Sequence, residues 1–320
     1  MPRDNSRSNE PKPAPGNWET TLLDRIRKGK VTPVISDRLG DDVVLGGHDK
    51  LVQRYASQAS YPSEQASLAR VAQFKSITDE EIVDTVALKE NYVDFLKNRL
   101  FDLAEEQATA GLISGKKLIE VNEQFDDLKF PEFAKELGFP RLDDRRNPFL
   151  LLASLPFPIY VTTAYHHYLE AALSEKGKQP HTEICRWHKD LRAIPSVLQD
   201  PTYKGPSPGE PLVYHLHGSC RWPDSLVLTE DDHLQFLVAT SEGFGSTTDP
   251  VYNKVRDAMN ESLLLVGYSL SSWDFRSLFW GLIQKRERKL LSALTIQLEH
   301  SPLEELYLEK YMGKFEFKVY

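Results

Sequence analysis

The order of apolar and amphipathic segments predicts an α/β protein: a Rossmann-like, doubly wound parallel sheet with a helical insertion. From residue 149 onward, short apolar segments typical of strands alternate with segments typical of amphipathic helices. This alternation indicates a parallel sheet with helices on both faces. Residues 49–140 instead show helical periodicity almost throughout, so a block of helices is expected to interrupt the alternation.

The first 50 residues predict a tail, a helix and a strand. Residues 1–16 contain four prolines after Met1 among charged and small residues, a composition typical of a disordered tail. Asn17 is a suitable helix N-cap, and Gly29 is expected to end the helix that follows. The apolar run 31–36 predicts a buried strand, with Pro33 near an end or an irregularity. One Rossmann-like domain is then expected to span residues 17–320, with residues 49–140 as its insertion.

The second half of the chain supplies the remaining elements. Expected strands are 157–163, 211–218, 225–229, 262–269, 293–299 and 315–320, and expected helices are 164–177, 230–239, 271–286 and 302–312. Ser271 and Asp274 have the spacing of a capping box at the start of one helix. Because the last predicted strand runs to the end of the chain, we expect this polypeptide to be a fragment of a longer multidomain protein.

Composition excludes several classes of protein. The 39 Lys and Arg against 47 Asp and Glu leave a net charge of −8, which argues against direct nucleic-acid binding. Only two cysteines are present, too few for a disulfide framework or a four-cysteine zinc site. No apolar run approaches the ~18 residues of a membrane span, and the N-terminus lacks the apolar segment of a signal peptide. A cytoplasmic protein without a membrane partner is expected.

Candidate binding residues follow three of the predicted strands, because open parallel sheets bind ligands at the carboxyl ends of their strands. They are Thr162, Thr163 and Tyr165; His215, His217 and Gly218; and Gly267, Tyr268 and Ser269. The last group leads into a helix N-terminus, which favours an anion such as phosphate. The alternative is a set of ordinary strand-end turns, in which a histidine only bonds the backbone.

Three further groups have weaker patterns. His181, Cys185 and His188 could approach a metal, but they do not form a closed zinc set; packing of Cys185 beneath a loop is favoured, and no metal is expected. The acidic residues 230–232 are interpreted as the start of a helix. Arg276 either reaches a phosphate or lies on a solvated helix face.

The segments IYVTTAYHHYLEAAL, PLVYHLHGSCRWPDSLVLTEDDHLQFL and SLLLVGYSLSSWDFRSLFWGL resemble the sirtuin-like NAD-processing domains of bacterial defence proteins and multidomain signalling proteins. The resemblance covers about residues 20–320 and implies NAD as substrate or ligand. It implies that His217, followed by Gly218, accepts a proton from the nicotinamide ribose, with His215 as the alternative. It also places Gly267 and Ser269 against the adenosine side, and implies a homo-oligomer with further domains or a sensor partner.

The sequence departs from this family at two places. The family's Gly-Ala-Gly-x-Ser loop corresponds to residues 31–40, where Pro33, Val34 and Ile35 replace small residues and only Ser36 is retained; we expect their side chains to crowd a phosphate. The family's Thr-Thr-Asn-Tyr-Asp corresponds to residues 162–166, where Ala164 lacks the asparagine's hydrogen-bonding group. Ala164 is either an engineered substitution or a natural loss, and the other changes favour a natural, divergent branch.

Two functions therefore remain open. One is an NAD⁺ hydrolase (NADase), acting as an effector module in bacterial antiviral defence or signalling. The other is a catalytically degenerate domain that binds NAD or ADP-ribose, or serves as an assembly or sensor module. A zinc-dependent deacylase is disfavoured because the cysteine count excludes the usual zinc module.

Overall fold

The structure is a computed structural model that describes residues 18–63, 65–109, 111–241, 250–259, 262–268 and 292–296, together with Leu306, Lys310 and residues 318–319. The predicted tail 1–16 and the predicted helix 271–286, with Ser271, Asp274 and Arg276, lie outside the described residues, as does Ser269. In the part of the chain that is described, no helix is both long and apolar enough to cross a membrane.

A parallel sheet of seven strands, in the order β3-β4-β2-β1-β5-β6-β7, forms the centre of the described structure. The strands are β1 Val31–Ile35, β2 Ile159–Thr162, β3 His181–Ile184, β4 Leu212–His215, β5 Ser262–Val266, β6 Ser292–Ile296 and β7 Lys318–Val319. The chain starts in the middle at β1, builds one side with β2 to β4, and then builds the other side with β5 to β7. The Rossmann-like, doubly wound fold is thus confirmed, and its switch point lies beside β1.

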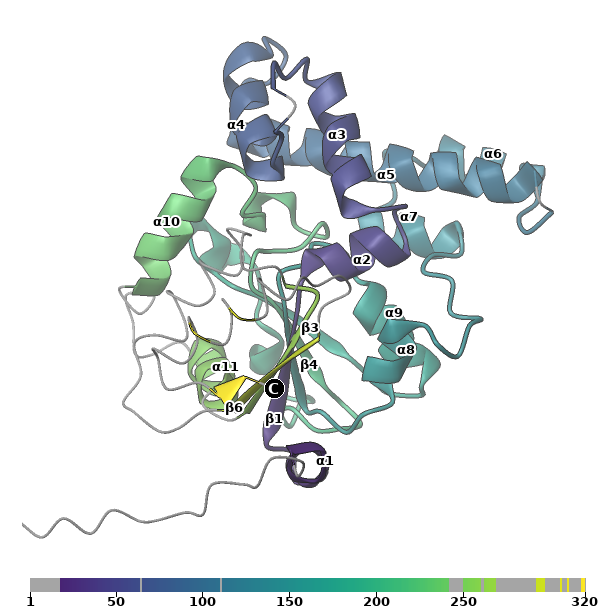
Figure 1. Ribbon diagram of the computed structural model, residues 1–320. Coiled ribbons are helices and arrows are strands. Elements are labelled where there is room, and N and C mark those ends of the chain that lie inside the picture. The colour runs from purple at the N-terminus through teal and green to yellow at the C-terminus, as the bar shows by residue number, and fades with distance from the viewer. Residues whose placement is uncertain are drawn as a thin grey trace, which may run out of the picture.

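Helices cover both faces of this sheet and one of its ends (Figure 1). They are α1 Trp18–Arg27, α2 Asp37–Val43, α3 His48–Gln58, α4 Leu68–Thr78, α5 Thr85–Thr109, α6 Gly115–Glu123, α7 Phe130–Glu136, α8 Pro148–Ala153, α9 Tyr168–Glu175, α10 Glu230–Ser241 and α11 Pro250–Met259. Three short 3₁₀ helices, η1 Lys189–Ala193, η2 Val197–Gln199 and η3 Pro223–Ser225, lie in the connections.

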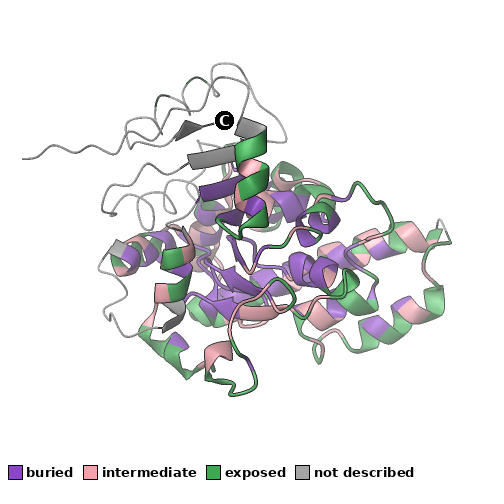
Figure 2. Ribbon diagram, turned by 90° about the horizontal axis from the view of Figure 1, so that it is seen from below, coloured by how far each residue is buried: buried purple, intermediate pink, exposed green. Residues whose placement is uncertain are grey.

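Two hydrophobic cores explain why the central strand is apolar at nearly every position. Val31 and Ile35 of β1 belong to the core shared with α2–α9. Val34 belongs to the opposite core, with Phe236 of α10 and Val255 of α11. Side chains alternate between the faces of a strand, so a strand covered on both faces must be apolar on both. Figure 2 shows this buried centre surrounded by helices with exposed outer faces.

Helices α3–α7 occupy the range in which the sequence predicts a helical block. Tyr55, Tyr92 and Phe95 form its aromatic centre, with ring centroids 5.0–5.9 Å apart. Tyr92 also lies edge-on to Tyr165, just beyond β2, with centroids 6.0 Å apart. In Figure 1 these helices gather at the end of the sheet where β1 leads into α2, whereas α1 lies at the opposite end. The block therefore adjoins the carboxyl ends of the strands.

One predicted strand was wrong, and one strand was not predicted. Residues 225–229 form the end of η3 and an irregular segment, although Leu226, Val227 and Leu228 are fully buried. Their apolar character reflects burial against the cores, not sheet pairing. The edge strand β3 was missed because its first three residues are polar and the first two are only partly buried.

Candidate functional site

The segment after β1 places Ser36 and Asp37 at the start of α2. The Ser36 N–H donates to the carbonyl of Val266 at 2.9 Å, and its Oγ accepts from the N–H of Arg38 at 3.3 Å. The carboxylate of Asp37 accepts from that same Arg38 N–H at 2.9 Å. The chain's own side chains thus occupy the helix N–H groups that could otherwise bind an anion, and Asp37 adds a negative charge.

The expectation that Pro33, Val34 and Ile35 crowd a phosphate was wrong. All three lie inside β1 and are fully buried in the sheet, so they do not form the loop that follows the strand. The segment after the strand instead begins with Ser36 and the acidic Asp37. Its N–H donates to Oγ1 of Thr163 at 3.3 Å, which ties the loop to the end of β2.

Thr162, Thr163 and Tyr268 meet Ser36 at the switch point, as strand-end placement predicted. Thr162 Oγ1 and Tyr268 Oη both donate to the carbonyl of Ile35, at 3.0 and 3.3 Å. Thr163 Oγ1 lies 3.3 Å from Tyr268 Oη. Gly267 has a φ of +78° and passes close to Ser36. These hydroxyls connect the ends of β1, β2 and β5 into one polar network.

Ala164 contributes only its backbone to this site. Its N–H donates to Thr162 Oγ1 at 3.0 Å, and its carbonyl accepts from Nδ1 of His215 at 2.8 Å. The methyl group is buried and cannot hold a water molecule by hydrogen bonding. Beside it, Tyr165 donates from Oη to the carbonyl of Val227 at 2.6 Å, and so fixes the loop between His217 and α10.

His215 is held in a buried ion pair. Its side chain is 0% exposed, and its Nε2 lies 2.7 Å from Oε1 of Glu170. Burial by itself raises the pKa of Glu170, but the charge of His215, then His167, and the hydrogen bond from His215 lower it to about 2. The carbonyl of Ala164 and the carboxylate of Glu170 engage both ring nitrogens of His215. His215 is therefore poorly placed to accept a substrate proton.

His217 has the opposite character. It is 1% exposed, and its ring meets His233 and Phe236 of α10 edge-on, with centroids 5.3 and 5.1 Å away. Burial lowers the pKa of His217 well below its ordinary value, and the nearby His233 lowers it further. The ring is therefore neutral at physiological pH, the form that can accept a proton. A ligand can reach it only if α10 or its flanking segments shift.

The turn after His217 depends on Gly218. Its φ is +81°, and a Cβ there would overlap the carbonyl oxygen of Ser225. The N–H of Val227 also donates to the carbonyl of His217 at 2.9 Å. A glycine at this position is required by the close approach of two backbone segments, whatever ligand the site binds.

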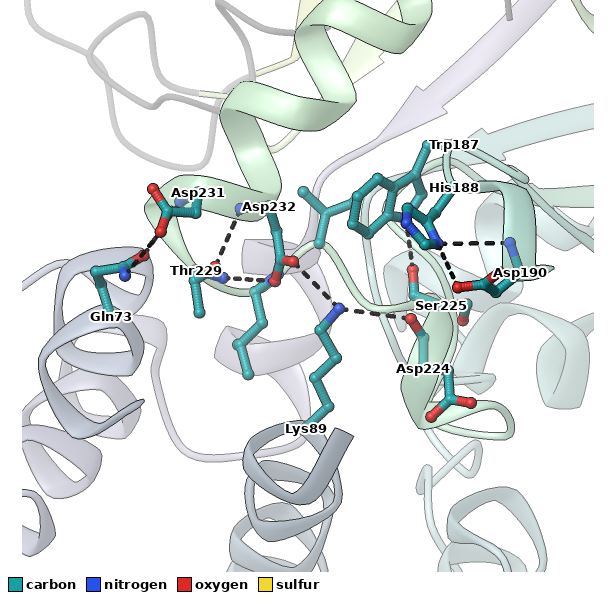
Figure 3. Close-up of polar contacts among 12 residues, drawn as sticks. Gln73, Lys89, Trp187, His188, Asp190, Asp224, Ser225, Thr229, Asp231 and Asp232 are labelled. Atoms are coloured by element: carbon teal, nitrogen blue, oxygen red, sulfur yellow. Dashed lines mark hydrogen bonds and ion pairs between the residues drawn. The ribbon is translucent and has the colours of Figure 1, made fainter. Parts of the chain in front are cut away.

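Sequence reasoning missed a buried lysine that attaches the helical block to α10. Nζ of Lys89, on α5, lies 3.2 Å from Oδ1 of Asp232, and the two side chains are only 6% and 7% exposed (Figure 3). The same ammonium lies 5.1 Å from the centre of the Trp187 ring. Asp232 and Thr229 cap α10 reciprocally, each accepting the other's N–H at 3.0 Å. Lys89 has no distinguishing neighbour in the sequence, so only the fold reveals its partner.

The weaker metal candidate is not assembled. The ring of His181 lies 4.0 Å from that of Tyr203, Cys185 is fully buried, and His188 contacts Asp190. Among the described residues, side chains that could share a metal ion instead form two other groups, with ligand atoms within 4.8 Å of one another. They are His167, Glu170 and His215; and Asp37, Asp41 and His48.

Comparison with known proteins assigns the second half of the chain. Residues 158–314 match the family model described as "SIR2-like domain". No curated protein matches the chain. The match begins immediately before β2 and includes β2 to β6, whereas β1, α2 and the helices α3–α7 precede it. The sheet nevertheless combines both parts, because β1 pairs with β2 and β5.

Proposed function

Residues 158–314 are a SIR2-like domain, and from this premise we propose that the protein binds NAD or ADP-ribose without cleaving NAD. The binding site in this proposal lies at the switch point formed by Ser36, Thr162, Thr163, Gly267 and Tyr268. In this proposal the hydrolytic step is absent because Ala164, at the position of the family's asparagine, has no side-chain group that could position the attacking water.

The missing side-chain amide at Ala164 is the main observation that supports this proposal. Its position corresponds to the family's asparagine, and both of its backbone polar groups are already bonded, to Thr162 and His215. Replacing an amide by a methyl group removes every side-chain donor and acceptor from the position. His215, the alternative proton acceptor, is engaged by Glu170 and Ala164. Two of the groups expected to carry out the chemistry are therefore missing or engaged.

Calorimetric titration and a nicotinamide-release assay test the proposal together. We expect the purified chain to bind NAD or ADP-ribose and to release no nicotinamide above a heat-denatured control. Because Asp37 faces the phosphate in the proposed site, Asp37→Asn should tighten binding about two- to fivefold, the effect of one charge at a helix start. Asp24→Asn, the same charge change in α1 at the opposite end of the sheet, should leave affinity unchanged.

Absence of binding for both nucleotides would reject the nucleotide-binding function and leave only an assembly role. Equal effects of Asp37→Asn and Asp24→Asn would show that the phosphate lies elsewhere.

An NAD⁺ hydrolase is the second candidate, and buried, neutral His217 favours it. This function needs α10 to move so that NAD reaches the ring, as could occur on assembly. Nicotinamide release by the native chain that disappears in His217→Ala would establish it and refute the binding-only proposal. Ala164→Asn should increase release if the missing amide is the limiting group.

The wider role is also part of the proposal. We place the domain in a cytoplasmic homo-oligomer, joined to further domains or a sensor partner of a bacterial antiviral defence or signalling protein. Light scattering of the purified chain, with and without NAD, measures the oligomeric state. A strictly monomeric species under both conditions would contradict the homo-oligomer.

A further inference from the structure

Three metal-ligating side chains meet beside the switch point, where α9 begins and β4 ends. His167 and Glu170 are three residues apart around the start of α9, so they lie on one face of the helix. His215 is the last residue of β4. One ligand atom of each lies within 4.8 Å of the others, and the rings of His167 and His215 have centroids 5.0 Å apart.

Two buried polar atoms of these three side chains lack hydrogen-bond partners. Oε1 of Glu170 accepts from His215 and from Thr182 Oγ1, at 2.7 and 3.0 Å. Its other oxygen, Oε2, is buried without a hydrogen-bond partner, and Nδ1 of His167 is also buried without one. Glu170 is 8% exposed. A buried carboxylate oxygen without a donor is unfavourable, and a cation is one group that satisfies it.

The orientation of the histidines suits a metal. Nε2 of His167 lies 3.2 Å from Oγ of Ser219, whereas its Nδ1 is buried without a hydrogen-bond partner and is available as a ligand. Nδ1 of His215 donates to the carbonyl of Ala164, which directs Nε2 toward Glu170. A backbone carbonyl on the second ring nitrogen is the usual way in which proteins orient a metal-binding histidine.

We propose that His167, Glu170 and His215 bind a divalent transition-metal ion of the zinc class, with a fourth position open. Two imidazoles and a carboxylate form a donor set that zinc accepts, with bonds of about 2.0–2.1 Å. Ligand atoms around one such ion are about 3.3 Å apart, so His215 Nε2 and Glu170 Oε1, which lie 2.7 Å apart, must separate slightly when the ion enters. The Nε2 proton of His215 passes to solvent as the metal replaces it on Glu170.

Zinc titration of the chain, after dialysis against a chelator, tests this site. We expect one equivalent of Zn²⁺ per chain, and Co²⁺ should give the visible absorption of a low-symmetry site. His167→Ala and Glu170→Gln should each weaken Zn²⁺ binding at least about 100-fold. The partly exposed His188, which contacts Asp190 and the ring of Trp187, provides the matched control: His188→Ala should still bind one full equivalent of Zn²⁺.

The second histidine–carboxylate group supplies a further comparison, because His48→Ala removes a ligand at Asp37 and Asp41. If His48→Ala still binds one Zn²⁺ per chain, the proposed site is supported; if it no longer binds Zn²⁺, the proposal is overturned. No Zn²⁺ binding tighter than about 100 μM, or unchanged binding in His167→Ala, also overturns it. Should Glu170→Gln not fold, as judged by circular dichroism, His167→Ala decides the question, because the His167 side chain makes no cap bond to α9 and its one hydrogen bond is to Oγ of Ser219.

Discussion

Removing the Lys89 ammonium should cost far more stability than removing an equally close but exposed charge. Lys89 and Asp232 join α5 to α10 through a 3.2 Å ion pair whose side chains are 6% and 7% exposed. In Lys89→Met the side chain keeps a similar aliphatic length, while Asp232 stays buried and loses the cation with which it pairs among the described residues. We therefore expect the free energy of unfolding to fall by about 3 kcal/mol, the lower part of the range for breaking a buried pair.

The lower part of that range applies because Asp232 retains other partners. Its Oδ2 still accepts the N–H groups of Leu228 and Thr229, both at 3.0 Å. These bonds compensate part of the carboxylate's lost solvation. Lys89 also lies over Trp187 at 5.1 Å, and the methionine that replaces it retains packing there but loses the attraction of a cation for the ring.

A second ion pair to helix α10 provides a matched control. Arg70 of α4 pairs with Glu230 of α10 at the same 3.2 Å distance, but the two side chains are 55% and 45% exposed. Arg70→Met should therefore cost only about 0–1 kcal/mol. Comparing the two variants separates the effect of burial from the effect of distance.

Urea unfolding followed by circular dichroism measures both variants, with the slope against denaturant checked for constancy. In the double variant Lys89→Met, Asp232→Asn the buried charge is gone, so its cost should be at least 1 kcal/mol below the sum of the single costs. The reasoning is refuted if Lys89→Met costs less than about 1 kcal/mol, or no more than Arg70→Met.

Two more predictions concern a turn and a titrating pair. Gly218→Ala forces a Cβ against the Ser225 carbonyl at a φ of +81° and should lower the free energy of unfolding by about 3 kcal/mol or more. Gly115→Ala, with open space around the new methyl group, should be neutral or stabilising by up to about 1 kcal/mol. Urea unfolding distinguishes the two variants, and equal effects would contradict the steric argument. Burial lowers the pKa of His48, but its hydrogen bond to Asp41 and the nearby carboxylates together raise it from 6.5 to about 9. The stabilisation from protonated His48 is therefore complete below pH 6.5 and is lost as the pH rises through about 9. His48→Ala should flatten this dependence of the unfolding free energy on pH. An NMR titration midpoint of His48 near 6.5 would contradict the prediction.

Much of the fold could be predicted because its cause is local. The run VTPVI is apolar at consecutive positions, as a strand covered on both faces must be, and β1 indeed lies between two cores. Edge strand β3 was not predicted because its first three residues are polar and the first two are partly exposed, a pattern that loops share. The segment after Ser225 was misassigned because burial alone makes a segment apolar, whether or not it pairs in a sheet.

The positions of the candidate site residues followed from the sequence, but their chemical states did not. Strand-end placement brings together Ser36, Thr162, Thr163 and Tyr268, since parallel strands end at one edge. It does not reveal that Glu170 binds His215 or that α10 covers His217. Protonation depends on burial and on neighbouring charges, and these neighbours come from distant parts of the chain.

By itself, the sequence determined the α/β alternation and the strand ends that carry polar residues, and it places Ala164 where the resemblance predicts an asparagine. Only the tertiary structure decided that His215 is committed to an ion pair, that His217 is neutral and covered, and that Lys89 attaches the helical block to α10. The reason is physical: side-chain periodicity is set by adjacent residues, whereas desolvation and hydrogen-bond partners are set by whichever residues folding brings into contact.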